Sequence, residues 1–256
     1  MRRFLPLVAL SLTIAAGCQQ FFTSSVATAL ARPPQKITTL SAASATTFAE
    51  TLAQNPDPAI AATALSALSA LIAPSANPSA ATITAAAQVA VIASGLDSAL
   101  TQSIASVNLS AITSGTAPTS QELQQISTII GTASTSLTGA SATASAAIFA
   151  SLAQTASTPA GAQSLKDSGI GAQTLVVAAT SVAITEINTR LAALNPNPAL
   201  PPKTIADVIA DPVATPMPTM SAATTTELSN LAAGLQAVDP TNQLLGTLKT
   251  VLNLKF

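Results

Sequence analysis

Large apolar residues recur at helical spacing along a chain built mainly from alanine, serine and threonine, and this periodicity most constrains the fold. One series with spacings of three, four or seven comprises Leu123, Ile126, Ile130, Leu137, Ala144, Ile148 and Leu152. A second comprises Val89, Ile92, Leu96, Leu100, Ile104 and Val107, and a third Val176, Ile184, Ile187, Leu191 and Leu194. At 100° per residue, each series falls on one side of an α-helix. The spacing therefore predicts helices that each bury one seam.

Prolines lie mostly between these periodic segments, which argues against a disordered chain and marks where helices begin and end. Asn77 before Pro78, and Thr158 before Pro159, have the pattern of an N-cap followed by a first-turn proline. The expected helices cover residues 38–54, 58–73, 78–107, 120–156, 159–194, 221–238 and 240–253. We therefore predict an all-α fold, a bundle of long Ala/Ser/Thr-rich amphipathic helices with Pro-rich connections.

The N-terminal stretch "MRRFLPLVALSLTIAAGCQQ" has the layout of a secretory signal peptide. Arg2 and Arg3 form the positive end, an apolar run covers residues 4–16, and small residues precede Cys18, the only cysteine of the chain. As a helix the apolar run spans about 20 Å, well short of the ~30 Å hydrocarbon core, so it suits a cleaved signal better than a permanent anchor. A single cysteine also excludes an intramolecular disulfide.

The residues "AAGC" that end at Cys18 resemble the lipobox of bacterial lipoprotein precursors, although this class usually has Leu where the chain has Ala15. The resemblance implies that the Cys18 thiol receives a diacylglycerol and that cleavage before it makes Cys18 the lipidated first residue. Gln19 stands where Asp is the usual retention signal in diderm bacteria, which implies the outer membrane. Two alternatives stay open: an ordinary secretory signal cleaved at a later A-x-A such as Ala27–Ala29, and an uncleaved membrane anchor.

Proline-dense stretches set the expected domain organisation. Residues 1–17 are the signal peptide, 18–37 a lipid-anchored tether, 38–194 the helical bundle, 195–219 a Pro-rich linker and 220–256 a C-terminal helical hairpin. The tether contains two adjacent prolines, and the linker contains "NPNPALPPK" and "DPVATPMPT". Proline interrupts helices and therefore favours a boundary at these places.

Charge is scarce, at 7% of residues, and this excludes several classes of partner. Removal of residues 1–17 leaves seven basic against ten acidic side chains, a formal charge of −3. The chain has no run of Lys and Arg and no Trp or Tyr to stack on bases, so we expect no nucleic-acid binding and no polybasic recognition of anionic lipid. The most apolar window, residues 170–185, is shorter than the ~20 residues of a membrane span, so we expect no second membrane segment.

The residues that usually carry catalysis are missing or poorly placed. Without His the chain has neither a Ser-His-Asp triad nor an imidazole metal ligand, and acylated Cys18 leaves no thiol. "GIGAQT", which starts at Gly169, lacks the third glycine of a dinucleotide turn and favours a kinked helix instead. Asp207 and Asp211 are four residues apart, but nearby prolines limit that helix to about two turns, where such carboxylates are ordinarily solvated. We therefore predict no enzyme, no cofactor and no metal.

These observations predict an exported, lipid-anchored envelope protein with a structural, scaffolding or assembly role. The alternative is a helical module in the periplasm that binds a lipid or hydrophobic ligand. The expected partners are the membrane, through the lipid anchor, and a second copy or another envelope protein, through the helices between Ser120 and Leu194. Gly131 and Gly139, eight residues apart, permit a close helix crossing, either between copies or inside one bundle.

Replacement of Cys18 by Ala tests the anchor. Because the thiol is the acyl acceptor in this class, cells fed labelled palmitate should label the wild-type protein and leave Cys18→Ala unlabelled. The measurement is the label recovered with each protein after immunoprecipitation. Equal label in both proteins would exclude lipidation at Cys18.

Overall fold

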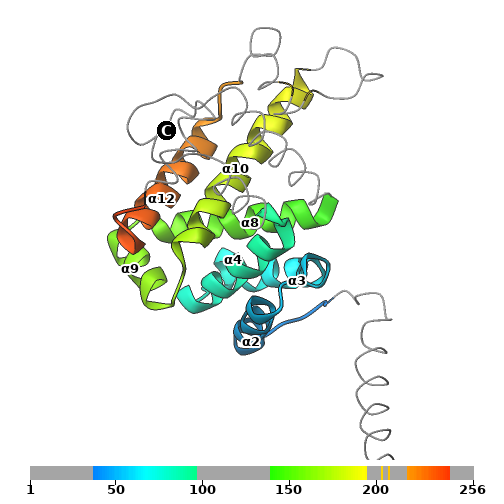
Figure 1. Cartoon of the computed structure of the whole chain (residues 1–256), viewed down its shortest axis with the longest axis vertical. Coiled ribbons are helices and arrows are strands. Elements are labelled where there is room, and N and C mark those ends of the chain that lie inside the picture. The colour runs from blue at the N-terminus through cyan, green and yellow to red at the C-terminus, as the bar shows by residue number, and fades with distance from the viewer. Residues whose placement is uncertain (1–36, 97–138, 195–202, 204–206, 208–217, 243–256) are drawn as a thin grey trace, which may run out of the picture. The chain divides into compact units, whose positions relative to one another are not determined.

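The computed structural model describes residues 37–96, 139–194, 203, 207 and 218–242. The chain divides into two compact units, residues 1–36 and 37–256, and every described residue belongs to the second unit. Within the described residues the secondary structure consists of helices without any strand (Figure 1). The predicted all-α class is therefore confirmed for this part of the chain.

The α-helices follow one another in the order α2 (Ala42–Gln54), α3 (Pro58–Leu71), α4 (Ala80–Ser94), α8 (Gly139–Ala156), α9 (Pro159–Asp167), α10 (Ala172–Ala193) and α12 (Ala222–Val238). A short 3-10 helix, η1 (Pro74–Ala76), separates α3 from α4. The expected helix 240–253 lies almost wholly outside the described residues, and so do residues 120–138 of the expected helix 120–156.

Local caps explain most helix starts. The Asp57 carboxylate accepts hydrogen bonds from the backbone N–H groups of Ala59 at 2.9 Å and Ile60 at 3.0 Å, and Pro58 occupies the first turn of α3. Thr158 caps α9 in the same way ahead of Pro159, as predicted. These side chains satisfy backbone donors that a helix terminus leaves without partners.

The predicted cap at Asn77 is wrong. Asn77 ends η1 in the left-handed region, with φ 46°, and the helix that was expected to begin at residue 78 begins at Ala80. The cap is Ser79, whose hydroxyl accepts the backbone N–H of Thr82 at 3.2 Å. The helix expected at 38–54 likewise begins only at Ala42, after the Ser41 cap.

Glycines divide two segments that were expected to be continuous helices. Gly95, with φ 63°, ends α4 at Ser94, so the predicted helix 78–107 is interrupted there. Gly169, with φ 80°, separates α9 from α10 within the predicted helix 159–194. Its N–H donates to the Lys166 carbonyl at 3.0 Å and that of Ile170 donates to the Leu165 carbonyl at 3.2 Å, which is a Schellman motif. The "GIGAQT" stretch therefore ends one helix and begins the next.

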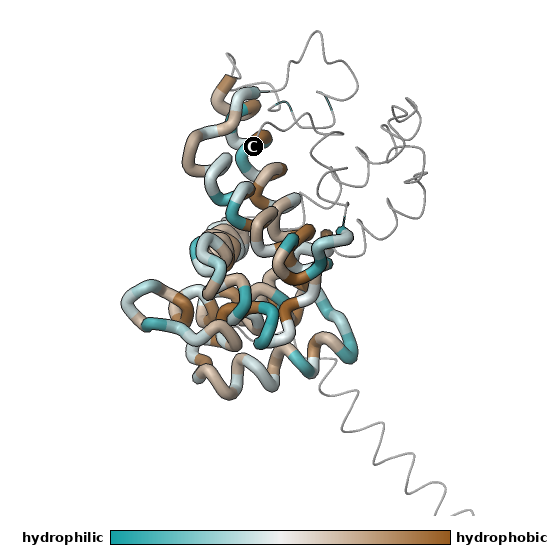
Figure 2. Tube along the Cα trace, turned by 90° about the vertical axis from the view of Figure 1, so that its left-hand side faces the viewer, coloured by the Kyte–Doolittle hydropathy of each residue, from teal (hydrophilic) through white to brown (hydrophobic). Residues whose placement is uncertain are grey.

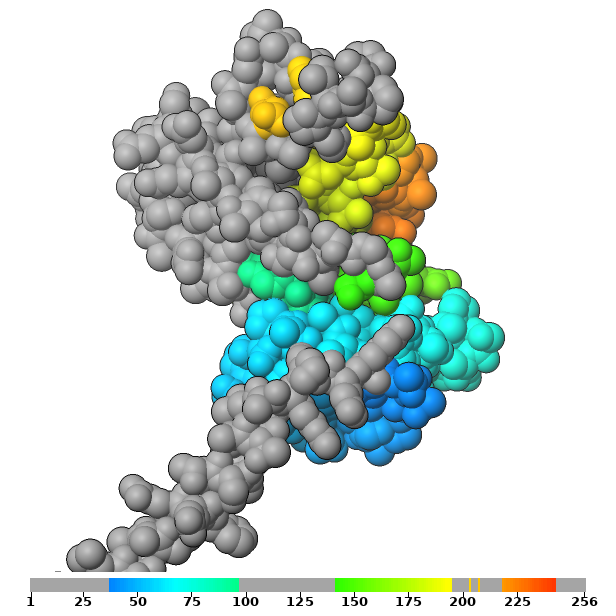
Figure 3. Space-filling model, turned by 90° about the vertical axis from the view of Figure 1, so that its right-hand side faces the viewer, coloured from blue at the N-terminus to red at the C-terminus, as the bar shows by residue number. Residues whose placement is uncertain are grey.

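Helices α4 and α10 are central to the described core. Helix α4 contacts α2, α3, α8, α9 and α10. Helix α10 packs chiefly on α12, and α10 and α12 lie side by side above α8 (Figure 1 and Figure 3). Residues 82–87 and 174–181 are continuously buried, so these two helices bury most of their circumference rather than one seam. Figure 2 shows apolar residues distributed through the body rather than along one outer face.

The predicted seams lie in the core or, at Ile92, packed against it wherever the structure describes them, and Leu194 is the exception. Ile148, Leu152, Val89, Val176 and Ile187 are each fully buried. Leu194, the last member of the third series, is 67% exposed, because it caps the C-terminal end of α10 beyond the packed part of the helix.

Helix α10 is the one described helix long and apolar enough to cross a membrane by length and composition. However, 67% of its most apolar window is buried against the rest of the protein. This burial is typical of the core helix of a globular body, which passes the same test.

Alanine is the commonest side chain in the core, and small residues bring helix backbones together. One such approach joins α12 to α8 at Gly234. A Cβ atom placed on Gly234 would lie 2.9 Å from the Cβ of Ala156 and 3.7 Å from a methyl carbon of Leu175. Because the Ala156 Cβ is fixed to the backbone, any larger residue at 234 must separate the two helices.

Gly234→Leu is therefore expected to destabilise the fold by about 2 kcal/mol or more, the scale of overpacking a closed core. Ser229→Leu places the same side chain at an exposed position of α12 and should change the free energy of unfolding by no more than about 0.5 kcal/mol. Urea unfolding followed by far-UV circular dichroism measures both. Equal stability of the two variants would contradict the close contact between α8 and α12.

Candidate functional site

A cavity of about 340 Å³ lies where the end of α4 meets α8, α10 and α12. Its lining consists of Ser94, Leu96, Ala142, Ser145, Ala146, Phe149, Ser181, Val182, Ile184, Thr185, Glu186, Asn188, Thr189, Thr224 and Glu227. The lining combines apolar side chains with hydroxyl groups and two carboxyl groups. This combination is typical of sites that orient a small ligand by a few polar contacts.

Helical spacing places the α8 side of the lining. Ala142, Ser145, Ala146 and Phe149 are separated by three, one and three residues, so they share one face of α8. Phe149 is the largest fully buried side chain in the described core, and together with Leu96 and Ile184 it forms an apolar wall of the cavity. A rigid apolar wall of this kind can receive methylene or methyl groups of a ligand.

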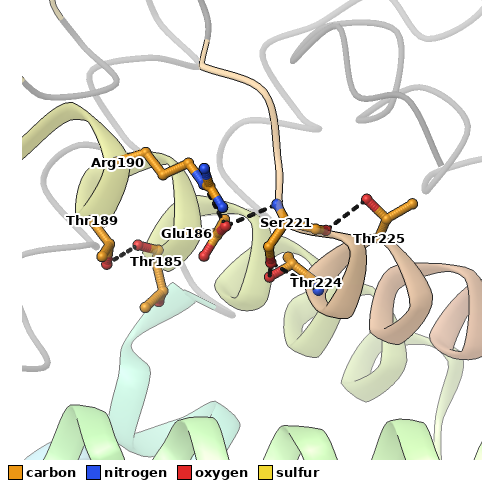
Figure 4. Close-up of polar contacts among 7 residues, drawn as sticks. All are labelled: Thr185, Glu186, Thr189, Arg190, Ser221, Thr224 and Thr225. Carbon is orange, nitrogen blue, oxygen red and sulfur yellow. Dashed lines mark hydrogen bonds and ion pairs between the residues drawn. The ribbon is translucent and has the colours of Figure 1, made fainter. Parts of the chain in front are cut away.

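Glu186 joins α10 to the start of α12. Its Oε1 accepts from the Arg190 Nε at 2.7 Å and from the backbone N–H of Ser221 at 3.0 Å (Figure 4). Ser221 is the N-cap of α12, so the carboxylate also lies at the positive end of that helix. The Arg190 hydrogen bond is the main reason that the pKa of Glu186 is lowered, and it outweighs the opposing effect of burial.

Glu227 lines the same cavity, but its pKa is shifted in the opposite direction to that of Glu186. Its pKa is raised, first because partial burial disfavours the charged form and second because the Glu186 charge repels it. No hydrogen bond joins its carboxyl group to any residue that the structure describes. Two neighbouring carboxyl groups therefore differ: Arg190 and the Ser221 N–H compensate the Glu186 charge, whereas no described residue compensates the Glu227 charge.

Ser145 adds a buried hydroxyl group to this cavity. The residue is 2% exposed, and within the described part of the chain its Oγ has no hydrogen-bond partner. Burial of a hydroxyl group without a partner costs free energy, and nearly all buried polar atoms in folded proteins are paired. The unpaired Oγ is therefore a place where a bound polar group would recover a lost interaction.

The residues singled out from the sequence do not form this site. Cys18, Gly131 and Asp211 lie outside the described residues, Gly139 is the first residue of α8, and Asp207 is an exposed residue away from the cavity lining. Among the described residues no three His, Cys, Asp or Glu side chains are grouped to hold a metal ion.

Sequence reasoning missed the cavity because its lining comes from segments more than 100 residues apart. The one local signal was the scarcity of charge. Glu186 and Glu227 are rare acidic side chains in helices otherwise rich in Ala, Ser and Thr. Acidic residues on the buried side of such helices mark a site worth inspection.

Comparison with family models, curated proteins and solved structures gave no match to this chain. The functional interpretation therefore depends on the N-terminal sequence, the helical body and this cavity. Each of these three supports a different part of it.

The two carboxyl groups are expected to respond oppositely to neutralisation. At neutral pH, Glu186→Gln should lower the free energy of unfolding by about 1 kcal/mol, because the charged hydrogen bond with Arg190 is lost. Glu227→Gln should raise it, since a group with a raised folded-state pKa loses stability as the pH rises through that pKa.

The pH dependence separates these effects from general damage. Below the ordinary glutamate pKa, Glu227 is protonated in both the folded and unfolded states, so Glu227→Gln should match wild type there. The Glu186→Gln deficit should shrink as pH falls through the lowered pKa of Glu186, where the wild type also loses its charge. Urea unfolding at neutral and acidic pH tests both. The same sign for both variants at neutral pH would refute the assignment.

Proposed function

We propose that this protein is exported and held in the bacterial cell envelope by a lipid on Cys18, where it has a structural, scaffolding or assembly role rather than a catalytic one. The observation that carries the proposal is the N-terminal signal layout that ends in the chain's only cysteine. The lipid is the membrane contact, and the outer membrane, facing the periplasm, is the proposed location.

The start of the described body fits a tethered arrangement. Ile37 is held to the body by its N–H, which donates to the Thr63 carbonyl at 3.1 Å, and α2 follows at Ala42. A chain anchored at Cys18 has residues 19–36 between the lipid and Ile37. That length of chain supports a body held near the membrane without insertion into it.

The surface chemistry of the body supports an assembly role. We infer that the helices form an amphipathic bundle whose outer faces carry mostly Ser, Thr, Gln and Ala. Helix α8 has no charged residue along Gly139–Ala156, and the described residues expose few large apolar side chains, among them Ile60 and Leu194. A face of small polar residues with little charge permits close approach of a second copy or another envelope protein at little side-chain entropy cost.

Self-association through α8 gives a direct test. The acyl-free protein is expected to sediment above the monomer mass at tens of micromolar, with the fraction assembled rising with concentration. Ala147→Arg, which places a charge on the exposed side of α8, should shift the equilibrium towards monomer. Ala43→Arg, the same change at an exposed position of α2, is the matched control and should leave it unchanged.

The second candidate is a module that binds a lipid or hydrophobic ligand, and the cavity beside Phe149 favours a small ligand of this kind. A monomer whose mass is unchanged with concentration would contradict assembly and leave this candidate ahead. Recovery of a bound lipid on native extraction would support the module, whereas a ladder of cross-linked oligomers in cells would support the scaffold.

A further inference from the structure

We propose that the cavity between α4, α8, α10 and α12 binds a primary alkylammonium group, with the Glu227 carboxylate as its charge partner. The group belongs either to a small free amine or to the lysine side chain of another protein. The proposal concerns this cavity alone and does not depend on lipidation or self-association.

The two carboxyl groups of the lining indicate the sign and the number of charges on the ligand. Arg190 and the Ser221 N–H already satisfy Glu186 at 2.7 and 3.0 Å, so its charge is not available. Glu227 has no hydrogen-bond donor among the described residues. Among the described residues of the lining, Glu227 is therefore the one uncompensated carboxylate, which calls for a ligand with one positive charge. A partly buried carboxylate gains most from a partner that brings both charge and N–H donors.

Hydrogen-bond capacity favours ammonium over a metal ion. A primary ammonium group has three donors, which match the Glu227 carboxylate and hydroxyl acceptors such as Ser145 and Ser181 of the same lining. The Ser145 Oγ, which is buried and without a partner in the described part of the chain, is the clearest free acceptor. Calcium, by contrast, takes six to eight oxygen ligands, and the described residues contain no group of three candidate metal ligands.

The apolar wall selects the rest of the ligand. The uncharged side chains of Leu96, Phe149 and Ile184 line the cavity and can cover a short methylene chain. The volume of about 340 Å³ is at the lower end of small-molecule sites, which suits a chain of a few carbons rather than a fatty acyl group. A lysine side chain, with four methylene groups and a terminal ammonium group, has this combination.

Isothermal titration calorimetry of the mature protein at neutral pH tests the site, with a buffer blank that contains the same detergent. The ligands are n-pentylammonium chloride, Nα-acetyl-lysine methylamide and uncharged 1-pentanol. We expect an ammonium ligand to bind and pentanol to bind at least about tenfold more weakly, because it lacks the charged hydrogen bond. Binding of the pentylammonium ion alone identifies a small free amine, and comparable binding of the lysine derivative identifies a protein side chain.

Variants locate the binding. Glu227→Gln should weaken pentylammonium about tenfold or more, whereas Glu50→Gln, an exposed glutamate on α2, should bind as wild type does. Ala146→Leu should also weaken binding by filling the cavity while leaving the carboxylate in place. Circular dichroism verifies that each variant is folded. Equal affinity of wild type and Glu227→Gln, pentanol affinity equal to that of the ammonium ion, or no binding by either amine would overturn the proposal.

Discussion

Close approach of helix backbones is the constraint on which the described fold depends. Gly234 of α12 lies against Ala156 of α8, where even one added methyl group would meet a Cβ at 2.9 Å. In the first turn of α9, a Cβ on Gly161 would overlap the carbonyl oxygen of Thr155 in α8. A core made largely of alanine gains little free energy from each side chain, so stability requires many such contacts. Helices α4 and α10 meet this requirement by burying most of their circumference. A core of larger side chains would reach the same buried area with fewer buried residues in each helix.

The cavity follows from the same constraint. Four helices converge beside Phe149, the largest buried side chain, and small residues on α8 such as Ala142 and Ala146 leave space next to it. The polar groups of the lining then differ in how well they are satisfied. Glu186, with Arg190 and the Ser221 N–H, links α10 to the start of α12, whereas Glu227 and Ser145 contribute no hydrogen bond to the described structure. One part of this polar cluster therefore links the helices, and the other has no partner among the described residues, which is the basis of the proposed ligand site.

Features fixed by neighbouring residues could be predicted from the sequence, and those fixed by distant segments could not. The caps at Asp57 and Thr158 involve side chains within three residues of their partners, and the helical class follows from spacing within single segments. The sequence did not show that Gly169 would end a helix completely, because a glycine in a periodic pattern is also compatible with a kink. Burial around α4 was missed because alanine is compatible with both core and surface. The cavity was missed because Ser94 and Glu227 meet only after folding.

Attachment to a membrane would lower the affinity that contacts between these proteins need. A protein held on a surface by one lipid meets its neighbours at an effective concentration far above its average in the compartment, often in the millimolar range for short tethers. Weak contacts between faces of Ser, Thr and Ala, such as those of α8, would then suffice for assembly. The same reasoning applies to a cavity with one unpaired carboxylate, whose single charged contact gives modest affinity for a free amine. If that amine is a lysine of another anchored protein, confinement supplies the remaining free energy, so the lysine source and the scaffolding role favour each other.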